Sequence, residues 1–189
     1  MFAGGIGVTP FVSICSELIA RSSLPGRGSL PPTLRRVILV WAVRETDTLS
    51  VFADMIAPLI QQAGGKGLSK IEFSVQLYIT KNNDAADPLS PYHTSCEHTG
   101  VASDDQMRGA AAAALCRSVA INGRPLIDVI LNRTVHETRE YIVNRDGVGS
   151  FDGVTHVTAM VCGPEQLSRE VSEASFEQGI DFHSEVFMF

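Results

Sequence analysis

Apolar residues recur with a helical period in several stretches of this 189-residue chain. The first stretch follows a glycine-rich turn, and Pro10 suits its opening turn because the missing N–H has no helical partner there. The expected core face of that helix consists of Phe11, Ile14, Cys15, Leu18 and Ile19. In a later helix, the residues expected to face the core are Leu126, Val129, Ile130 and Val135. Helices are therefore expected within residues 10–23, 47–65, 123–141 and 164–179. The alanine-rich residues 105–120 indicate a further helix.

Between these helices, apolar residues form short runs that are typical of strands. Residues 37–43 are an unbroken run, "VILVWAV", which indicates a parallel strand buried on both faces. Residues 71–79 alternate apolar and polar side chains, so we expect this strand at an edge of the sheet. Further strands are expected at residues 154–162 and 182–189. This alternation of strands and helices predicts an α/β protein with a doubly wound, mainly parallel sheet that binds ligands at the carboxyl ends of its strands.

Composition narrows the class of protein. The net charge is −6 and no cluster of lysines and arginines occurs in the sequence, so there is no reason to expect a nucleic-acid partner. The longest apolar run, residues 37–43, is much shorter than the roughly 20 residues that span a bilayer. The four cysteines are scattered, which favours reduced thiols in a cytosolic or stromal setting. We expect a single domain, residues 1–189, with a polar loop insertion over residues 81–106.

Two glycine-containing turns lie where ligands of such a sheet bind. The first, "GGIGVTP" at residues 4–10, has little side-chain bulk, so its N–H groups could face a diphosphate. It departs from the dinucleotide fingerprint G-x-G-x-x-G because Pro10 replaces the third glycine, and a purely structural turn explains it nearly as well. The second turn, "VCGP" at residues 161–164, also follows an expected strand and opens a helix. The pair is a more specific signal than either turn alone.

Charged and metal-ligating side chains add two candidates. Arg44 follows the strand at residues 37–43, where its guanidinium could hold the 2′-phosphate of a dinucleotide, although a solvated loop charge fits equally well. The second candidate is a trio in one polar loop, but without a second ligand group it favours a solvated loop, and no metal site is expected. That trio is His93, Cys96 and His98. His183 fits either the core or an interface.

Several motifs, taken in order, resemble those of one protein family. They are "AGGIGVTPF" at residues 3–11, "VWAVRE" at 40–45, "GRP" at 123–125, "VCGP" at 161–164 and "FHSEVFMF" at 182–189. Together they resemble the NAD(P)H-binding domain of the ferredoxin–NADP reductase superfamily, and most closely its ferric reductase and NADPH oxidase branch. The last motif is similar to the ending of plant-type ferric-chelate reductases. The resemblance covers nearly the whole chain apart from the loop near residues 81–106.

The resemblance implies which residues bind the coenzyme. The amides from Gly5 to Thr9 would cradle the pyrophosphate, and Thr9 and Pro10 would approach the nicotinamide ribose. Arg44 would favour NADPH. The implied coenzyme-binding set is Gly4, Gly5, Ile6, Gly7, Val8, Thr9, Pro10, Arg44, Glu45, Cys162, Gly163 and Pro164.

Two residues are implied at the hydride-transfer step itself. Cys162 would lie beside the nicotinamide ring as a positioning residue, since hydride transfer needs proximity more than acid–base chemistry. Phe189 would cover the flavin ring and give way when the nicotinamide stacks there.

The resemblance also implies a larger enzyme. In the family, an FAD-binding domain and membrane helices that carry haem precede this domain, and no segment here resembles either. Electrons from NADPH would pass through FAD and haem to ferric chelates, with dioxygen as an alternative acceptor. A noncatalytic nucleotide-binding remnant is a third interpretation. We expect a soluble carboxyl-terminal piece, attached to a membrane through its parent protein and facing the cytoplasm or an organelle stroma.

The family's first strand lies in the middle of the sheet, and only Met1, Phe2 and Ala3 precede the glycines here. A sheet without most of that strand leaves ladder groups of its two neighbours unpaired, at roughly 1–3 kcal/mol for each buried group. We therefore expect the first central strand to be largely missing and the isolated chain to fold poorly.

Overall fold

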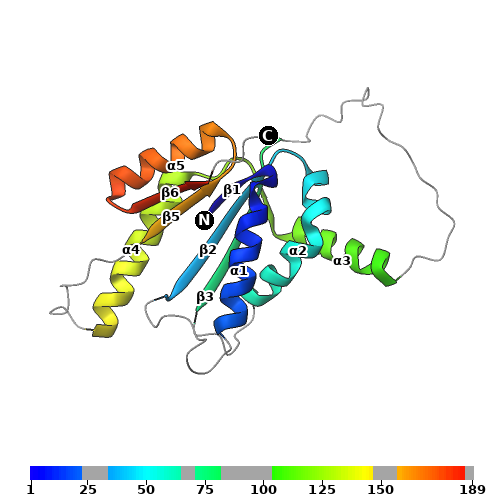
Figure 1. The fold of residues 1–189 in the computed structure, drawn as a ribbon, viewed down its shortest axis with the longest axis horizontal. Coiled ribbons are helices and arrows are strands. Elements are labelled where there is room, and N and C mark those ends of the chain that lie inside the picture. The colour runs from blue at the N-terminus through cyan, green and yellow to red at the C-terminus, as the bar shows by residue number, and fades with distance from the viewer. Residues whose placement is uncertain (23–33, 65–70, 82–103, 147–156, 186–189) are drawn as a thin grey trace.

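The computed structural model describes residues 1–22, 34–64, 71–81, 104–146 and 157–185 (Figure 1). The six strands in these residues form one sheet in the order β4-β3-β2-β1-β5-β6, and all neighbouring pairs are parallel. The doubly wound α/β fold expected from the sequence is therefore confirmed. The strands are β1 (Phe2–Gly4), β2 (Arg36–Val43), β3 (Glu72–Ile79), β4 (Ala120–Asn122), β5 (Thr158–Cys162) and β6 (Asp181–Glu185).

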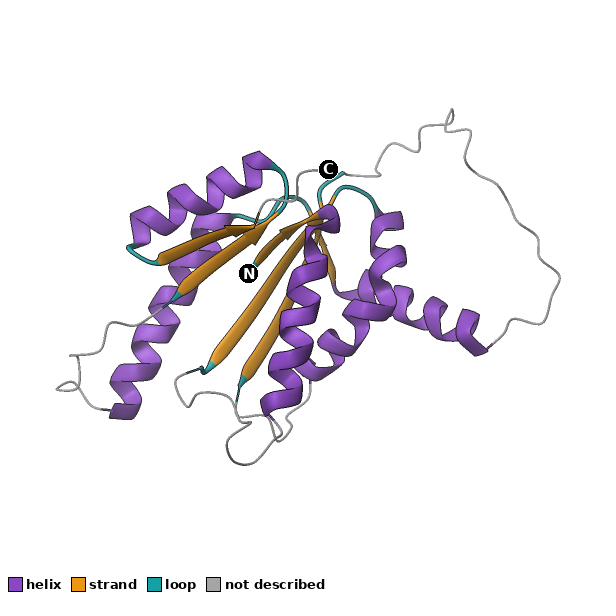
Figure 2. Cartoon of the chain, viewed as in Figure 1, coloured by secondary structure: helices purple, strands orange, loops and turns teal. Residues whose placement is uncertain are grey.

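Helices cover both faces of the sheet (Figure 2). On one face lie α1 (Thr9–Ser22) and α2 (Thr46–Gly64), and α3 (Asp104–Val119) packs mainly against α2. On the opposite face lie α4 (Ile127–Asp146) and α5 (Glu165–Gln178). The five helices expected from the sequence are present at the expected places. Within the described residues, no helix combines the length and the apolar character that crossing a membrane requires.

Alternation along the strands divides the core between the two faces. Leu39 and Trp41 of β2 pack into the core shared with α1 and α2, whereas Val40 packs into the core under α4 and α5. β1 behaves in the same way, with Ala3 in the first core and Phe2 in the second. Burial on both faces explains why β2 is a continuous apolar run.

β1 is short and lies in the middle of the sheet, as expected from the sequence. Met1 continues its ladder, because the Met1 carbonyl accepts from the Val40 N–H at 2.8 Å and the Met1 amine donates to the Ile38 carbonyl at 2.8 Å. Strands β2 to β4 follow on one side of β1, and β5 and β6 lie on the other. The strand order thus reverses beside β1, which is where a doubly wound sheet opens a crevice for ligands.

β4 is a strand that the sequence analysis did not predict, and it changes the position of β3. β4 pairs with the last three residues of β3, Leu77–Ile79, so the prediction that β3 is an edge strand is wrong at its carboxyl end. β4 spans three residues and follows α3 directly, so it is too short to show an apolar period of its own.

The buried face of α4 differs from the predicted one. Leu126 and Val129 are 64% and 52% exposed, so their predicted inward positions are wrong. Leu126 precedes the first residue of the helix, and the apolar stripe therefore begins one position later than predicted. The residues of α4 that are buried are Ile127, Ile130, Leu131 and Val135.

Trp41 ties β2 to the turn after β1, and its replacement should destabilise the fold. Its side chain is fully buried, its indole N–H donates to the Gly5 carbonyl at 2.8 Å, and its ring meets that of Phe52 edge-on. Trp41→Phe removes the donor and opens a cavity, so we expect the free energy of unfolding to fall by about 2–4 kcal/mol. Urea unfolding followed by circular dichroism measures this change.

Phe52→Leu is the matched control, because it removes the aromatic contact and keeps the hydrogen bond of Trp41. We expect it to lower the free energy of unfolding by about 1 kcal/mol. Equal losses in the two variants would contradict the stabilising role of the bond to Gly5.

Candidate functional site

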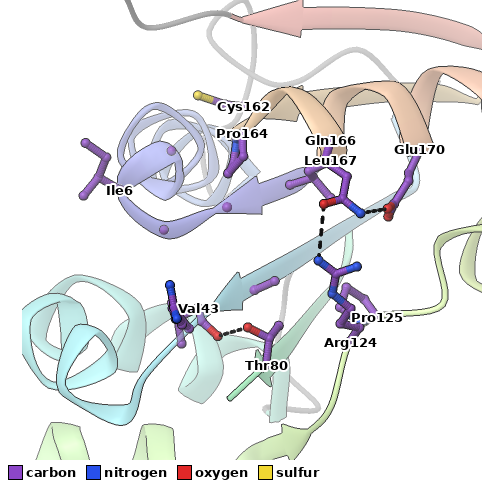
Figure 3. Close-up of a pocket in the computed structure, with 16 residues that line it drawn as sticks. Ile6, Val43, Thr80, Arg124, Pro125, Cys162, Pro164, Gln166, Leu167 and Glu170 are labelled. Carbon is purple, nitrogen blue, oxygen red and sulfur yellow. Dashed lines mark hydrogen bonds between the residues drawn. The ribbon is translucent and has the colours of Figure 1, made fainter. Parts of the chain in front are cut away.

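A cavity of about 570 Å³ opens at the carboxyl ends of β1 to β5 (Figure 3). Its volume lies within the range of small-molecule and coenzyme sites, and its position is the strand-order reversal beside β1. The turn after each of the five strands contributes to its wall, as does the first part of α5. The lining residues are Gly4, Gly5, Ile6, Gly7, Ala42, Val43, Arg44, Thr80, Arg124, Pro125, Cys162, Gly163, Pro164, Gln166, Leu167 and Glu170.

The turns after β1 and β5 touch each other backbone to backbone, and glycine makes that contact sterically possible. A Cβ added at Gly7 would overlap the Cys162 carbonyl group and lie 2.7 Å from its carbon. A Cβ added at Gly163 would lie 2.9 Å from the Gly4 nitrogen. The two glycine-containing turns, at residues 4–10 and 161–164, are therefore adjacent parts of one wall.

The first turn has the backbone shape of an anion cradle. Gly5 adopts a φ of +54°, which favours glycine, and starts the 3₁₀ helix η1 (Gly5–Val8) that runs directly into α1. The N-terminus of α1 therefore lies directly behind the turn, and its partial positive charge favours a bound anion. A phosphate group can approach this turn closely at Gly5, where the position of the missing side chain is open space, with no atom within 4 Å. The missing side chains of Gly4 and Gly7 serve the contact with the turn after β5 instead.

Two guanidinium groups line the other side of the cavity. Arg44 follows β2, and Arg124 follows β4; both side chains are exposed. Arg124 points toward α5, where its Nη2 lies 3.5 Å from Gln166 Oε1, and Gln166 Nε2 in turn donates to Glu170 Oε1 at 2.9 Å (Figure 3). The Arg124 contact is long, so its guanidinium keeps donors available for a phosphate.

Arg124 was not among the predicted site residues. The motif "GRP" at residues 123–125 contributed to the family resemblance, but the unpredicted strand β4 is what brings it to the ligand end of the sheet. A short strand before "GRP" is the signal that could have identified this arginine.

The thiol of Cys162 lies at the end of β5 and is 1% exposed. Burial raises the pKa of this thiol above its ordinary value, and the charge of Glu185 raises it further. The thiol therefore stays protonated at neutral pH, which suits packing and not nucleophilic chemistry. Its neighbours across the contact belong to the Gly7 turn.

The predicted coenzyme-binding residues divide into two groups. The larger group lines the cavity and comprises Gly4, Gly5, Ile6, Gly7, Arg44, Cys162, Gly163 and Pro164. Val8, Thr9, Pro10 and Glu45 lie outside that lining. Val8 is buried in the core, the Thr9 hydroxyl donates to the Ile6 carbonyl at 2.9 Å, and the Glu45 carboxylate lies 2.9 Å from the Lys81 ammonium.

Phe189 lies outside the described residues, as do His93, Cys96, His98 and the loop at residues 82–103. His183, on β6, is exposed, and one ring nitrogen lies 3.0 Å from the Glu185 carboxylate. Among the described residues, no three or more His, Cys, Asp or Glu side chains form a group that could hold a metal ion.

The parallel sheet, the paired glycine turns and the cavity at the strand-order reversal define the class of dinucleotide-binding domains. Comparison with known families identifies the family within this class. The ferric reductase NAD binding domain matches residues 1–176, and the chain belongs to this family. It is thus an NAD(P)H-binding domain of the ferric reductase and NADPH oxidase group, an oxidoreductase family.

Individual relatives agree with this assignment. Ferric reduction oxidases 7 (chloroplastic) and 2 of Arabidopsis thaliana are 32% identical over 84 residues and 30% identical over 92, or 44% and 46% of this chain. Dual oxidase 2 of Rattus norvegicus is 27% identical over 176 residues, or 92% of this chain. The matched segments span only 10% or 11% of these relatives.

The contact between the two glycine turns should not tolerate a methyl group at Gly7. Gly7→Ala forces Cβ into the Cys162 carbonyl, so we expect the free energy of unfolding to fall by about 2–3 kcal/mol. Thermal and urea unfolding measure the change.

Gly109→Ala is the matched control. Gly109 lies within α3, and its nearest neighbour to an added Cβ is a carboxylate oxygen of Asp54 at 3.8 Å. The same methyl group should therefore stabilise the protein, by up to about 1 kcal/mol, through helix propensity. Similar effects of the two substitutions would show that the turns are not in the close contact described.

Proposed function

We propose that this domain binds NADPH in the cavity and passes its hydride to FAD, within a membrane flavocytochrome that reduces ferric chelates. The observation that carries the proposal is the wall of two touching glycine turns facing Arg44 and Arg124. Bare backbone on one side and guanidinium groups on the other match a diphosphate and an additional phosphate. Membership of the ferric reductase NAD binding domain family supports the same coenzyme class.

The turn at Gly4–Gly7 holds the pyrophosphate in this proposal, because it lines the cavity with bare backbone and leads directly into the N-terminus of α1. Thr9 and Pro10 follow this turn at the start of α1 and are the residues proposed to approach the nicotinamide ribose, although neither lines the cavity in this structure. Arg44 binds the 2′-phosphate, and Arg124 lies in the same cavity as a second cation.

The turn at Cys162–Pro164 holds the nicotinamide end. When both are bound, NADPH supplies the hydride and FAD accepts it. The backbone at Cys162 and Gly163 presents a small surface to the nicotinamide, and the buried Cys162 thiol is uncharged because it stays protonated at neutral pH. These two residues hold the nicotinamide ring in place, and they transfer no proton. In the same proposal, Phe189 shields the flavin face until the nicotinamide replaces it.

The parent chain is proposed to carry the FAD-binding domain and the haem-bearing membrane helices, with this domain exposed to the cytoplasm or an organelle stroma. Support comes from the relatives, whose sequences are about ten times as long as the matched segments. The transcript sequence upstream of the Met1 codon tests this part of the proposal, which requires a flavin domain and haem-ligating histidines to be encoded there.

A second candidate is an oxidase module with dioxygen as the acceptor. One observation favours it, because the match to dual oxidase 2 extends over 92% of the chain, about twice the share matched by either ferric reduction oxidase. Assaying the parent protein with ferric chelate and with dioxygen separates the two acceptors.

Arg44→Ala should weaken NADPH binding by about tenfold to a hundredfold, the contribution of a charge-assisted contact to phosphate. NADH lacks the 2′-phosphate, so we expect the affinity for NADH to change by less than about twofold. The loss of an exposed charge has an effect of about that size. Isothermal titration of the purified chain with each coenzyme measures both values.

Arg21→Ala is the control, because Arg21 is an exposed arginine near the far end of α1 whose partner is Glu17 at 2.6 Å. It should leave both affinities unchanged. Equal losses for NADPH and NADH in Arg44→Ala would defeat the role given to Arg44. Saturable binding of neither coenzyme by the unmodified chain would favour the noncatalytic remnant.

A further inference from the structure

The edge of the cavity at residues 43–45, after β2, is held by hydrogen bonds and an ion pair from residues 80–81, after β3. Thr80 donates to the Val43 carbonyl twice, through its N–H at 2.8 Å and its hydroxyl at 3.2 Å. The Lys81 N–H donates to the Arg44 carbonyl at 3.0 Å, and the Lys81 ammonium lies 2.9 Å from the Glu45 carboxylate. Lys81 thus holds the chain at Arg44 and at the residue that follows it.

The charge of Glu45 bears on the choice between NADPH and NADH at this edge of the cavity. In doubly wound dinucleotide sites, an acidic side chain near this position accepts a hydrogen bond from the ribose 2′-hydroxyl, and it would repel a 2′-phosphate. Here Glu45 is next to Arg44 in the chain, but it does not line the cavity, and its carboxylate is paired with Lys81. The bond to Lys81 is the main cause that lowers the pKa of Glu45, so the carboxylate is ionised and paired at neutral pH.

We propose that Lys81 is a positioning residue for coenzyme selectivity, which holds the Glu45 carboxylate away from the 2′-position so that Arg44 alone meets the 2′-phosphate. This inference rests on the proposed function, because it assumes that the adenosine end of the coenzyme lies at Arg44. Lys81 acts through its ion pair with Glu45, without touching the coenzyme. Its bond to the Arg44 carbonyl comes from the backbone N–H, which other residues at this position retain. The Lys81 and Glu45 side chains are 52% and 47% exposed, so the pair can be broken without opening the core.

The test compares coenzyme affinities in a double-mutant cycle on the full 189-residue chain. Lys81→Gln breaks the pair and releases Glu45, so we expect NADPH to bind about fivefold more weakly, while NADH binds as before or more tightly. In the Glu45→Gln background no carboxylate is released, and Lys81→Gln should change NADPH affinity by less than about twofold. Lys81→Arg retains a cation for Glu45 and should keep the original ratio of affinities.

Three results would overturn the inference. One is an equal weakening of both coenzymes by Lys81→Gln, which is the signature of general disruption of this edge of the cavity. Another is the same fivefold loss of NADPH affinity in the Glu45→Gln background, which means that Lys81 contacts the phosphate directly. The third is a Lys81→Gln variant that binds both coenzymes as tightly as the unmodified chain.

Two controls keep this test separate from that of the proposed function. The melting temperature of Lys81→Gln should match that of the unmodified chain, because exposed ion pairs contribute little to stability. Arg21→Gln, which breaks another exposed pair, should leave both affinities unchanged. If the unmodified chain binds NADPH and Lys81→Gln leaves the ratio unaltered, only this inference fails. If the unmodified chain binds neither coenzyme, the proposed function fails and the inference with it.

Discussion

The contact between the turns after β1 and β5 is the constraint on which the rest of the site depends. Gly7 and Gly163 lie so close to the opposite turn that an added methyl group would meet backbone atoms. This contact brings two distant parts of the sequence together at the strand-order reversal, where neither turn alone would form a wall. The Trp41 indole N–H fixes the first turn by donating a hydrogen bond to the Gly5 carbonyl. Burial of Trp41 thereby couples the core of the domain to the shape of the cavity.

The remaining walls follow from the parallel register of the strands. Val43 of β2 is paired with Ile79 of β3, so the residues that follow each strand, Arg44 and Thr80, lie side by side at the same end of the sheet. The hydrogen bonds from Thr80 and Lys81 to the chain at Val43 and Arg44 extend this ladder beyond the strands. A parallel sheet thus collects charged side chains from separate turns without any local sequence motif.

Much of the fold could be predicted from the sequence because its signals are local. The apolar run of β2, the helical periods and the two glycine turns each lie within about 20 residues, and together they gave the fold class and half of the cavity wall. Arg44 could be identified because it directly follows a strong strand. The match to the ferric reductase NAD binding domain covers residues 1–176, which include both glycine turns and Arg44.

The features that could not be predicted depend on contacts between distant residues. β4 is a three-residue strand defined by pairing with β3, so Arg124 had no visible place at the ligand end of the sheet. The pairing of Glu45 with Lys81 joins residues 36 positions apart and depends on the β2–β3 register. Leu126 shows the limit of periodicity, because the pattern did not reveal that the helix starts one residue later.

Hydrogen exchange measured with and without NADPH tests the central claim most directly. If the coenzyme binds against the two touching turns, the amides of residues 4–8, 162–163 and 165–167 should exchange more slowly when NADPH is added. The amides at the opposite end of the sheet, at residues 36–38 and 72–74, should be unchanged. Slower exchange at that opposite end, with no change at the two turns, would contradict the account.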